Sequence, residues 1–292
     1  MFEGFKDVSA SVDGIHIHAI QAGRGPALLL LHGHPQTHAI WHKVAPALTQ
    51  HFTVIAADLR GYGDSGKPPG APDHANYAKR RMALDQLELM RALGHETFAV
   101  IGHDRGGRVA VRMALDHPDA LTRLVTLDVA PTLAMYEKTS FDFARAYWHW
   151  FMLVRPAPFP ETLIRANPDL YLKQTIGARS AGLAPFTAQA YAEYLRCLSD
   201  PDTAHGICED YRASVTIDLE HDRATLASQQ RIGCPFMSLW GAQGVIEQCF
   251  DPLAEWRAYA PDVQGEALPC GHYIPEEAPD RLLERVLPFL TE

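Results

Sequence analysis

The chain has 292 residues, of which 47% are hydrophobic and 21% are charged, and its formal net charge at pH 7 is -9. This length is enough for one large α/β domain, or for a core with a smaller insert. The negative charge argues against a nucleic-acid partner, but it does not exclude a small anionic substrate, because local arginines can override the global sign.

The cysteines and the N-terminal residues bear on compartment and cofactors. The five cysteines are scattered and form no C-x-x-C pair, which argues against a disulfide framework or a zinc site. We expect no metal and no other cofactor. The first residues lack the pattern of a signal peptide, and no apolar stretch approaches about 18 residues. We therefore expect a cytoplasmic protein that has no membrane partner.

The beginning of the chain predicts a β-hairpin over residues 9–20, with Asp13-Gly14 as its turn. The second arm alternates apolar and polar residues with a period of two. This alternation places His16 and His18 on the outward face, as exposed strand residues rather than as metal ligands.

Short apolar runs then alternate with helical patterns. The runs that predict strands are residues 27–31, 52–57, 98–101, 124–127 and 235–240. Continuous apolar runs are typical of parallel strands that are buried on both faces. Amphipathic patterns at 77–93 and at about 276–289 predict helices. This order predicts an α/β fold with a mostly parallel, doubly wound sheet, whose active groups lie at the carboxyl ends of the strands.

The alternation of strands and helices stops between about residues 131 and 231. This segment is mostly helical in pattern and rich in aromatic residues. We interpret it as a helical cap inserted over the carboxyl edge of the sheet. The predicted organisation is therefore a first part of the core at 1–130, a cap at 131–231 and a second part of the core at 232–292.

The segment Gly102-His103-Asp104-Arg105-Gly106-Gly107-Arg108 follows one of the predicted strands and leads into a helix. Strand, sharp turn and helix make a nucleophile elbow, in which glycines allow the bend and the close packing. Such elbows often carry serine, but here the residue is Asp104. An aspartate that attacks saturated carbon leaves an ester, which water can cleave, whereas a serine would leave an ether. Asp104 thus predicts displacement at an sp3 carbon or opening of an epoxide; the alternative is that it only caps the helix.

The turn His32-Gly33-His34 follows the strand at 27–31. In hydrolases with an elbow, this turn supplies one backbone N–H of the oxyanion hole, and the residue after the nucleophile supplies the other. The candidates are the N–H groups of His34 and Arg105. The alternative is an ordinary loop between a strand and a helix.

Several local motifs together point to a family. They are H-G-x-P-Q-T at 32–37, G-H-D-R-G-G-R at 102–108, H-W at 149–150, C-E-D-Y-R at 208–212 and G-H-Y at 271–273. On these motifs the chain resembles α/β-hydrolases of the dehalogenase and epoxide-hydrolase branch, and most closely the haloacetate, or fluoroacetate, dehalogenases. The resemblance implies an Asp-His-Asp catalytic triad at Asp104, His272 and Asp128, and it suggests a homodimer.

The chemistry of the residues supports this triad independently. Hydrolysis of an aspartyl ester needs a base to activate water, and a histidine on a late loop, His272, suits that role because its pKa lies near neutrality. An acid must orient the imidazole. Many relatives place this acid after the strand at 235–240, but that loop has no aspartate at the usual position. Asp128 is therefore the predicted partner, with Glu247 as the reserve.

Two arginines near the nucleophile indicate the class of substrate. Arg105 and Arg108 follow Asp104 at +1 and +4, in the first turn of the predicted helix. Cations there oppose the helix dipole at a cost of about 0.3–1 kcal/mol each, which suggests that they serve an anion. Two guanidinium groups bind a carboxylate well. The alternative is a pair of surface arginines.

The resemblance implies that His149, Trp150 and Tyr211 donate hydrogen bonds to the departing halide, and each side chain carries a suitable hydrogen. We interpret Trp148 as part of the packing of the cap. One residue departs from the family pattern: the family usually has Phe or Tyr where this chain has His34. This replacement leaves the preferred halogen and acid open.

The leading hypothesis is hydrolytic dehalogenation of a short, anionic 2-haloacid, such as a haloacetate, to glycolate and halide. One rival is an epoxide hydrolase with the same triad, in which Tyr211 would protonate the alkoxide. The other rival is a non-catalytic relative that binds a small carboxylate. The two arginines would have no evident task in the first, and the complete triad argues against the second.

Overall fold

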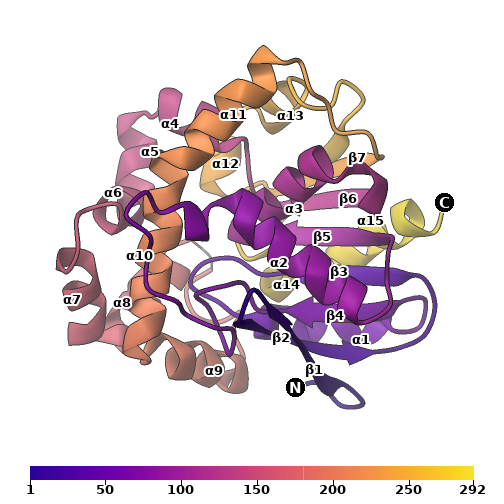
Figure 1. Cartoon of the computed structure of the whole chain (residues 1–292), viewed down its shortest axis with the longest axis horizontal. Helices are drawn as coiled ribbons and strands as arrows, with labels where there is room; N and C mark the ends of the chain where they lie inside the picture. Colours follow the sequence, from indigo (N-terminus) through magenta and orange to yellow (C-terminus); the bar gives the residue numbers. More distant parts are fainter. Residues whose placement is uncertain (180) are drawn as a thin grey trace.

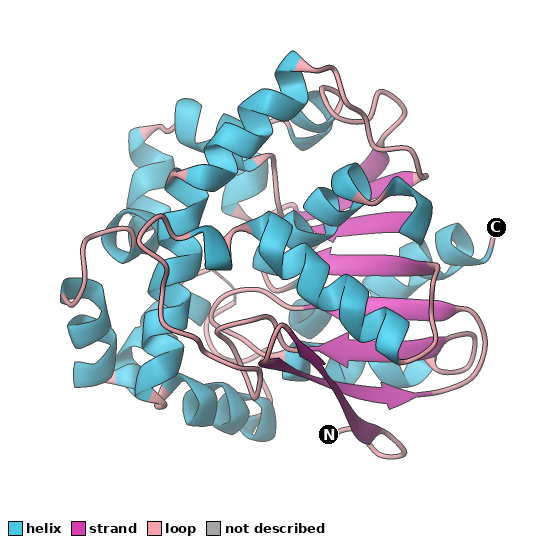
Figure 2. Cartoon of the chain, viewed as in Figure 1, coloured by secondary structure: helices cyan, strands magenta, loops and turns pink. Residues whose placement is uncertain are grey.

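The computed structural model describes residues 1–179 and 181–292, which form one eight-stranded sheet flanked by helices (Figures 1 and 2). The strands are β1 (Lys6–Val12), β2 (Ile15–Ala22), β3 (Ala27–Leu31), β4 (Thr53–Ala57), β5 (Phe98–His103), β6 (Leu121–Leu127), β7 (Phe236–Gly241) and β8 (Gln264–Leu268). Their order is β1-β2-β4-β3-β5-β6-β7-β8. The pairs β1–β2 and β2–β4 are antiparallel and the other neighbours are parallel. The predicted α/β fold with a mostly parallel sheet is confirmed.

Helices cover both faces of this sheet. Those of the core are α1 (Ala45–Leu48), α2 (Lys79–Ala92), α3 (Arg105–Asp116), α12 (Val245–Cys249), α13 (Pro252–Trp256), α14 (Ile274–Glu277) and α15 (Pro279–Thr291), with 3-10 turns η1 (His38–Lys43), η2 (Ala75–Tyr77) and η3 (Pro118–Ala120). In Figure 1, α2 and α3 lie in front of the sheet and α15 lies behind it. Successive side chains of β3 point to opposite faces. Leu29 and Leu31 accordingly join the core under α2 and α3, whereas Leu28 and Leu30 join the core under α15.

The segment between β6 and β7 is helical, as Figure 2 shows at one end of the molecule. Its helices are α4 (Thr132–Glu137), α5 (Phe141–Ala146), α6 (Trp148–Leu153), α7 (Phe159–Ala166), α8 (Pro168–Ile176), α9 (Ala188–Leu198), α10 (Pro201–Val215) and α11 (Ile217–Ala227). We call α4–α11 the cap. The proposed boundaries at 130/131 and 231/232 fall in the connecting loops. Within the described residues, no helix has both the length and the apolar character that a membrane crossing requires.

The structure differs from the predicted elements at two places. The helix predicted at about 276–289 is two helices, because the backbone leaves the helical region at Ala278 (φ -138°, ψ 53°), the residue before Pro279. A residue before proline is sterically disfavoured in the α region. Strand β8 was not identified in the sequence, since Gln264–Leu268 contains few apolar residues and only its last residue is buried.

Candidate active site

The turn between β5 and α3 holds Asp104 in a strained backbone conformation. Its φ is 47° and its ψ is -112°, values that a non-glycine residue rarely adopts. Its neighbours must be small: a Cβ atom at Gly33 would lie 2.4 Å from the Asp104 Cβ, and one at Gly102 would lie 2.5 Å from the Gly106 carbonyl oxygen. Asp104 accepts no capping hydrogen bond from the described N–H groups of α3. The capping alternative therefore lacks its main contact, and the side chain is directed elsewhere.

That direction is toward His272, on the loop between β8 and α14. The Nε2 atom of His272 lies 3.3 Å from Oδ2 of Asp104, and its Nδ1 lies 2.5 Å from Oδ2 of Asp128, which follows β6. The other Asp128 oxygen accepts a hydrogen bond of 2.8 Å from the Gly241 N–H. The structure thus brings together the three predicted triad residues. The reserve acid, Glu247, instead accepts a hydrogen bond from Trp240 Nε1.

The electrostatics of these groups are coupled. Burial raises the pKa of Asp104, but the hydrogen bond and charge of His272 and the charge of Arg179 outweigh burial and hold this pKa well below its usual range. Burial and Arg179 lower the pKa of His272, but the hydrogen bonds to Asp104 and Asp128 leave it above the ordinary histidine value. The Asp104 carboxyl is therefore ionised, and the free protein favours an imidazolium between two carboxylates.

His103 lies directly beside this group. Its Nε2 lies 2.9 Å from the His272 carbonyl oxygen, and the centres of the two rings are 4.7 Å apart. Burial and the neighbouring His272 lower the pKa of His103 to about 3. A neutral His103 can donate to that carbonyl and fix the loop that carries His272.

The two predicted oxyanion donors lie on adjacent turns. A Cβ at Gly33 would be 3.1 Å from the Arg105 nitrogen, so the loop after β3 touches the start of α3. The first N–H groups of a helix have no intrahelical acceptor. Among the described backbone hydrogen bonds, neither the His34 N–H nor the Arg105 N–H has a partner. Both are therefore available to a ligand.

Arg105 is completely buried and is paired with the cap, not exposed. Its Nε and Nη2 donate to the carboxylate of Asp210 on α10, at 2.8 and 2.7 Å. Asp210 also contacts Lys79 Nζ and accepts a hydrogen bond of 2.7 Å from the Tyr62 hydroxyl. The buried Nη1 of Arg105 has no partner among the described residues. Arg105 was predicted to serve a substrate anion, but two of its three guanidinium nitrogens are paired with the Asp210 carboxylate.

Arg108 differs from Arg105, because no carboxylate lies within ion-pair distance of it in the described part of the chain. Its Nη1 donates to the Ala130 carbonyl oxygen at 3.0 Å and to the Thr132 hydroxyl at 2.7 Å. Burial and the charge of Arg105 lower its pKa. A buried cation without a counter-charge is costly and attracts an anion.

The three predicted halide donors are buried in the cap, close to these guanidinium groups. Trp150 and His149 belong to α6 and Tyr211 belongs to α10. The Arg105 guanidinium lies 4.1 Å from the Tyr211 ring centre, and that of Arg108 lies 4.9 Å from the Trp150 ring. Nε2 of His149, Nε1 of Trp150 and the Tyr211 hydroxyl have no hydrogen-bond partner among the described residues. Buried polar groups are normally satisfied, so three in one place suggest a ligand.

His34 and Trp148 complete the wall. Nε2 of His34 lies 3.0 Å from the Tyr171 hydroxyl, and its ring stacks on His149 at 5.7 Å. Burial and the charge of Arg179 hold the pKa of His34 well below its ordinary value, which makes it a neutral, polar replacement for an aromatic ring. Trp148 was expected to pack inside the cap. This expectation was wrong, because its side chain is 37% exposed.

Comparison with known proteins shows the family to which the chain belongs. The profile of the alpha/beta hydrolase fold family matches residues 26–279. This chain belongs to the α/β-hydrolase family. It is 45% identical to a fluoroacetate dehalogenase from Burkholderia sp, over 100% of this chain and 96% of the relative. It is 35% identical to a soluble epoxide hydrolase from Corynebacterium sp. (strain C12), over 97% of this chain and 96% of the relative.

A solved structure from Nostoc sp PCC 7120, described as an alpha/beta hydrolase, is also similar to this chain. It superposes with a TM-score of 0.98 and 51% sequence identity, and the match covers 100% of both chains. These likenesses make the chain an α/β-hydrolase-fold hydrolase with dehalogenase and epoxide-hydrolase relatives.

Three residues of this hydrolase site were not predicted from the sequence. Asp210 lies inside the C-E-D-Y-R motif, so its position beside Tyr211 could have marked it as a counter-ion. Tyr147 precedes the H-W motif, and its hydroxyl lies 3.5 Å from His272 Nδ1. Arg179 contacts both His272 and Asp104, but no motif in its surroundings signals it.

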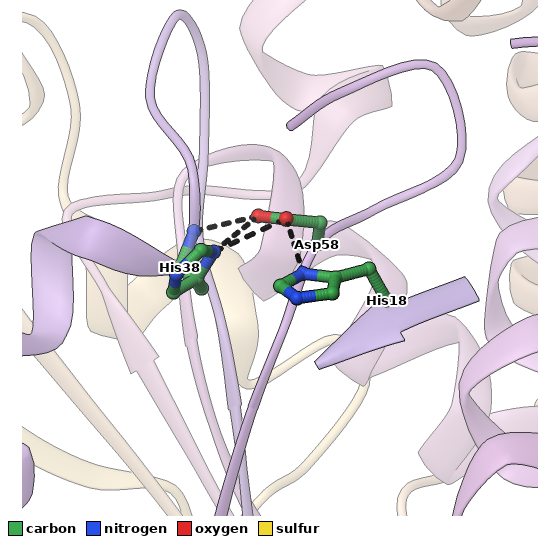
Figure 3. Close-up of side chains that lie close together, drawn as sticks. All are labelled: His18, His38 and Asp58. Carbon is green, nitrogen blue, oxygen red and sulfur yellow. Dashed lines mark hydrogen bonds and ion pairs between the residues drawn. The ribbon is translucent and has the colours of Figure 1, made fainter. Parts of the chain in front are cut away.

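Outside the active site, one described cluster has the residue types of a metal site: His18, His38 and Asp58 (Figure 3). Nδ1 of His18 lies 2.9 Å from the Asp58 carboxylate, and Nδ1 of His38 lies 3.0 Å from it. The carboxylate also accepts the N–H groups of His38 and Asp64, at 2.8 and 3.0 Å. Each imidazole can therefore donate a hydrogen bond to the Asp58 carboxylate, and this network ties β2 to the loops after β3 and β4.

The charge state of His18 fits such a hydrogen-bonded network. Burial lowers its pKa, but the hydrogen bond and charge of Asp58 raise it to about 9. The expectation that His18 is simply exposed was wrong, because it contacts a fully buried carboxylate.

Proposed function

We propose that this hydrolase cleaves the carbon–halogen bond of a short 2-haloacid, converting a haloacetate such as fluoroacetate to glycolate and halide through an ester on Asp104. One observation carries the proposal: a buried cation without a carboxylate partner, Arg108, stacks on Trp150, one of three buried donors that lack an acceptor among the described residues. The cation suits the carboxylate of a haloacid, and the donors suit its halide.

In the first step, the Asp104 carboxylate attacks the α-carbon of the substrate. A carbon–oxygen bond forms, the carbon–halogen bond breaks, and the halide leaves with the bonding electrons. The substrate carboxylate is held by Arg108 and by the unpaired Nη1 of Arg105. His149, Trp150 and Tyr211 donate hydrogen bonds to the halide. Fluoride depends most on them, because it is a poor leaving group that is strongly hydrated in water.

In the second step, water attacks the carbonyl carbon of the Asp104 ester. Nε2 of His272 takes the proton of the water, and Asp128 stabilises the imidazolium that forms. The backbone N–H groups of His34 and Arg105 stabilise the oxyanion. The bond between this carbon and the ester oxygen then breaks, the proton passes from His272 to the alkoxide of glycolate, and the regenerated Asp104 carboxyl releases the second proton of the water to solvent.

Epoxide hydrolysis is the second candidate, and the soluble epoxide hydrolase relative is the observation that favours it. The unpartnered Tyr211 hydroxyl could protonate the alkoxide of an opened epoxide. A neutral epoxide, however, offers nothing to the charge of Arg108, and a charge left buried without a partner is expensive. We therefore place it second.

The deciding experiment incubates the purified protein with fluoroacetate, with chloroacetate and with a simple epoxide such as styrene oxide. We expect released halide and glycolate from the haloacids, and little diol. Diol from the epoxide without halide from either acid would overturn the proposal in favour of the second candidate. Absence of every product would favour a protein that only binds carboxylates.

The ester intermediate can be observed directly in the His272→Ala variant. The first step does not need the base, so this variant should accumulate one carboxymethyl group on Asp104, visible as a mass increase of the intact protein after exposure to chloroacetate. Asp104→Asn is the control that should show no increase. An unmodified mass in the His272→Ala variant would contradict the two-step mechanism.

A further inference from the structure

Arg179, in the loop after α8, brings a guanidinium group of the cap into the triad. Its Nη1 lies 3.2 Å from His272 Nε2 and 3.7 Å from Asp104 Oδ2. Its carbonyl oxygen accepts a hydrogen bond of 2.9 Å from the His272 N–H. Arg179 is only 6% exposed, so its guanidinium is buried beside His272 and Asp104. The base and this arginine are therefore connected through both side chain and backbone.

The rest of the guanidinium is anchored independently of the triad. Nη2 donates to the Tyr273 hydroxyl at 2.5 Å and to the His34 carbonyl oxygen at 3.2 Å, and Nε donates to the Thr175 carbonyl oxygen at 3.2 Å. Because the guanidinium is planar and rigid, these contacts also hold Nη1 beside Nε2.

The protons of this cluster determine what Arg179 can do. An arginine N–H only donates, so a hydrogen bond from Nη1 needs a bare lone pair on His272 Nε2. A protonated Nε2 would instead donate to Asp104 and place its hydrogen against the cation. Formation of the ester removes the charge of Asp104, and with it the main reason for Nε2 to hold a proton. Arg179 then faces an imidazole that is held at Nδ1 by Asp128.

In the free protein His272 stands between two carboxylates, at 2.5 and 3.3 Å, and after formation of the ester the nearer one, Asp128, remains. This arrangement favours the imidazolium, which cannot take a proton from water. Titratable groups from several elements surround the His272 ring. The core supplies His103, Asp104, Asp128 and Tyr273. The segment between β6 and β7 supplies Tyr147, His149 and Arg179. Among the described residues, Arg179 is the cation within hydrogen-bond distance of Nε2.

We propose that Arg179 is a positioning residue for the second half-reaction: it keeps His272 neutral, with Nε2 unprotonated, once Asp104 has become an ester. The role in turnover rests on the proposed function, but the effect on His272 is a property of the free protein. The two can therefore be tested separately.

The test replaces Arg179 in the full-length protein by a neutral residue and measures the titration of His272. Arg179→Gln removes the charge and keeps a donor, and Arg179→Lys restores the charge. Histidine is isotopically labelled for NMR, and His272→Gln identifies the signal of His272 among the 15 histidines. We expect the midpoint to rise by about one to two pH units in Arg179→Gln, the size of a nearby charge effect, and to return most of the way in Arg179→Lys. Arg165→Gln, an exposed change on α7, is the control and should leave the midpoint unchanged.

The second readout is the pH dependence of ester hydrolysis in a single turnover with chloroacetate. In Arg179→Gln the acidic limb should move to higher pH, while the rate at the alkaline plateau stays close to that of the wild type. An unchanged His272 midpoint, or a rate that falls equally at every pH, would overturn the proposal. A raised KM with an unchanged pH profile would show instead that Arg179 binds substrate.

Should Arg179→Gln not fold, Arg179→Met supplies the same loss of charge. Failure of the wild type to release halide would refute the proposed function, whereas the titration would still decide the role of Arg179.

Discussion

The class of substrate that we propose rests mainly on one residue, Arg108. Its guanidinium is buried, has no carboxylate within ion-pair distance among the described residues, and spends its hydrogen bonds on the neutral oxygens of Ala130 and Thr132. A protein gains nothing in stability from such a charge, so an anion of the substrate is the simplest reason to keep it. Arg105 was predicted for the same task, but Asp210 occupies most of its donors. The spacing of the two arginines could not reveal this difference, since it depends on which cap helix lies above each one.

At the residue scale, the proposed halide donors should discriminate fluoride from chloride. Trp150→Phe removes the unpartnered Nε1–H and keeps the ring under Arg108. A hydrogen bond to a charged group contributes about 1.5–3 kcal/mol, so we expect turnover of fluoroacetate to fall about 10- to 150-fold. Turnover of chloroacetate should fall much less, because chloride leaves more readily.

The measurement is halide release with ion-selective electrodes for both substrates. Trp148→Phe is the matched control on the same helix, since Trp148 is partly exposed and belongs to none of the proposed subsites. Equal losses with fluoroacetate and chloroacetate would count against Trp150 as a halide donor.

Among the elements, α10 links the cap to the nucleophile elbow. Its Asp210 pairs with Arg105 at the start of α3, and it also contacts Lys79 at the start of α2. The ring of the adjacent residue, Tyr211, lies 4.1 Å from the Arg105 guanidinium, and its buried hydroxyl has no partner among the described residues. Strand ends and the elbow could be predicted from the sequence, because buried parallel strands and glycine turns have strong local patterns. The counter-ion of Arg105 could not, because a contact across 105 positions leaves no periodic signal.

At the element scale, Asp210→Asn should destabilise the protein strongly. The substitution leaves Arg105 and Lys79 buried without their shared carboxylate, and removal of one member of a buried ion pair typically costs about 3–5 kcal/mol. Urea unfolding at neutral pH measures this free energy. Asp202→Asn, an exposed change in the first turn of α10, should cost less than about 1 kcal/mol. A similar small cost for both variants would show that water or another group compensates the cations.

At the scale of the whole molecule, the site combines residues from the loops of the sheet with residues from the cap, α4–α11. The loops after β3, β5, β6 and β8 supply His34, Asp104, Asp128 and His272, while the cap supplies the halide donors and Arg179. The motifs of the sequence indicated most of these residues, since each motif is local. They could not indicate Arg179, whose contact with His272 depends on how the loop after α8 descends onto the core. The homodimer and the division into core and cap remain predictions.

Because the ligand should touch core and cap together, its binding should stabilise the whole fold. Asp104→Asn cannot form the ester and lacks the charge that repels an anion, so it should bind chloroacetate without turnover. A ligand at 100 times its Kd stabilises a protein by about 2.7 kcal/mol, and each kcal/mol raises the Tm of a chain of this size by about 2–4 °C. We expect the Tm to rise by several degrees with saturating chloroacetate.

Two controls test the role of charge. Chloroacetamide, which has the same shape but no charge, should shift the Tm little, and Arg108→Met in the Asp104→Asn background should abolish the effect of chloroacetate. Equal stabilisation by the acid and the amide would mean that the pocket recognises shape, and that the buried guanidinium of Arg108 serves something other than a substrate carboxylate.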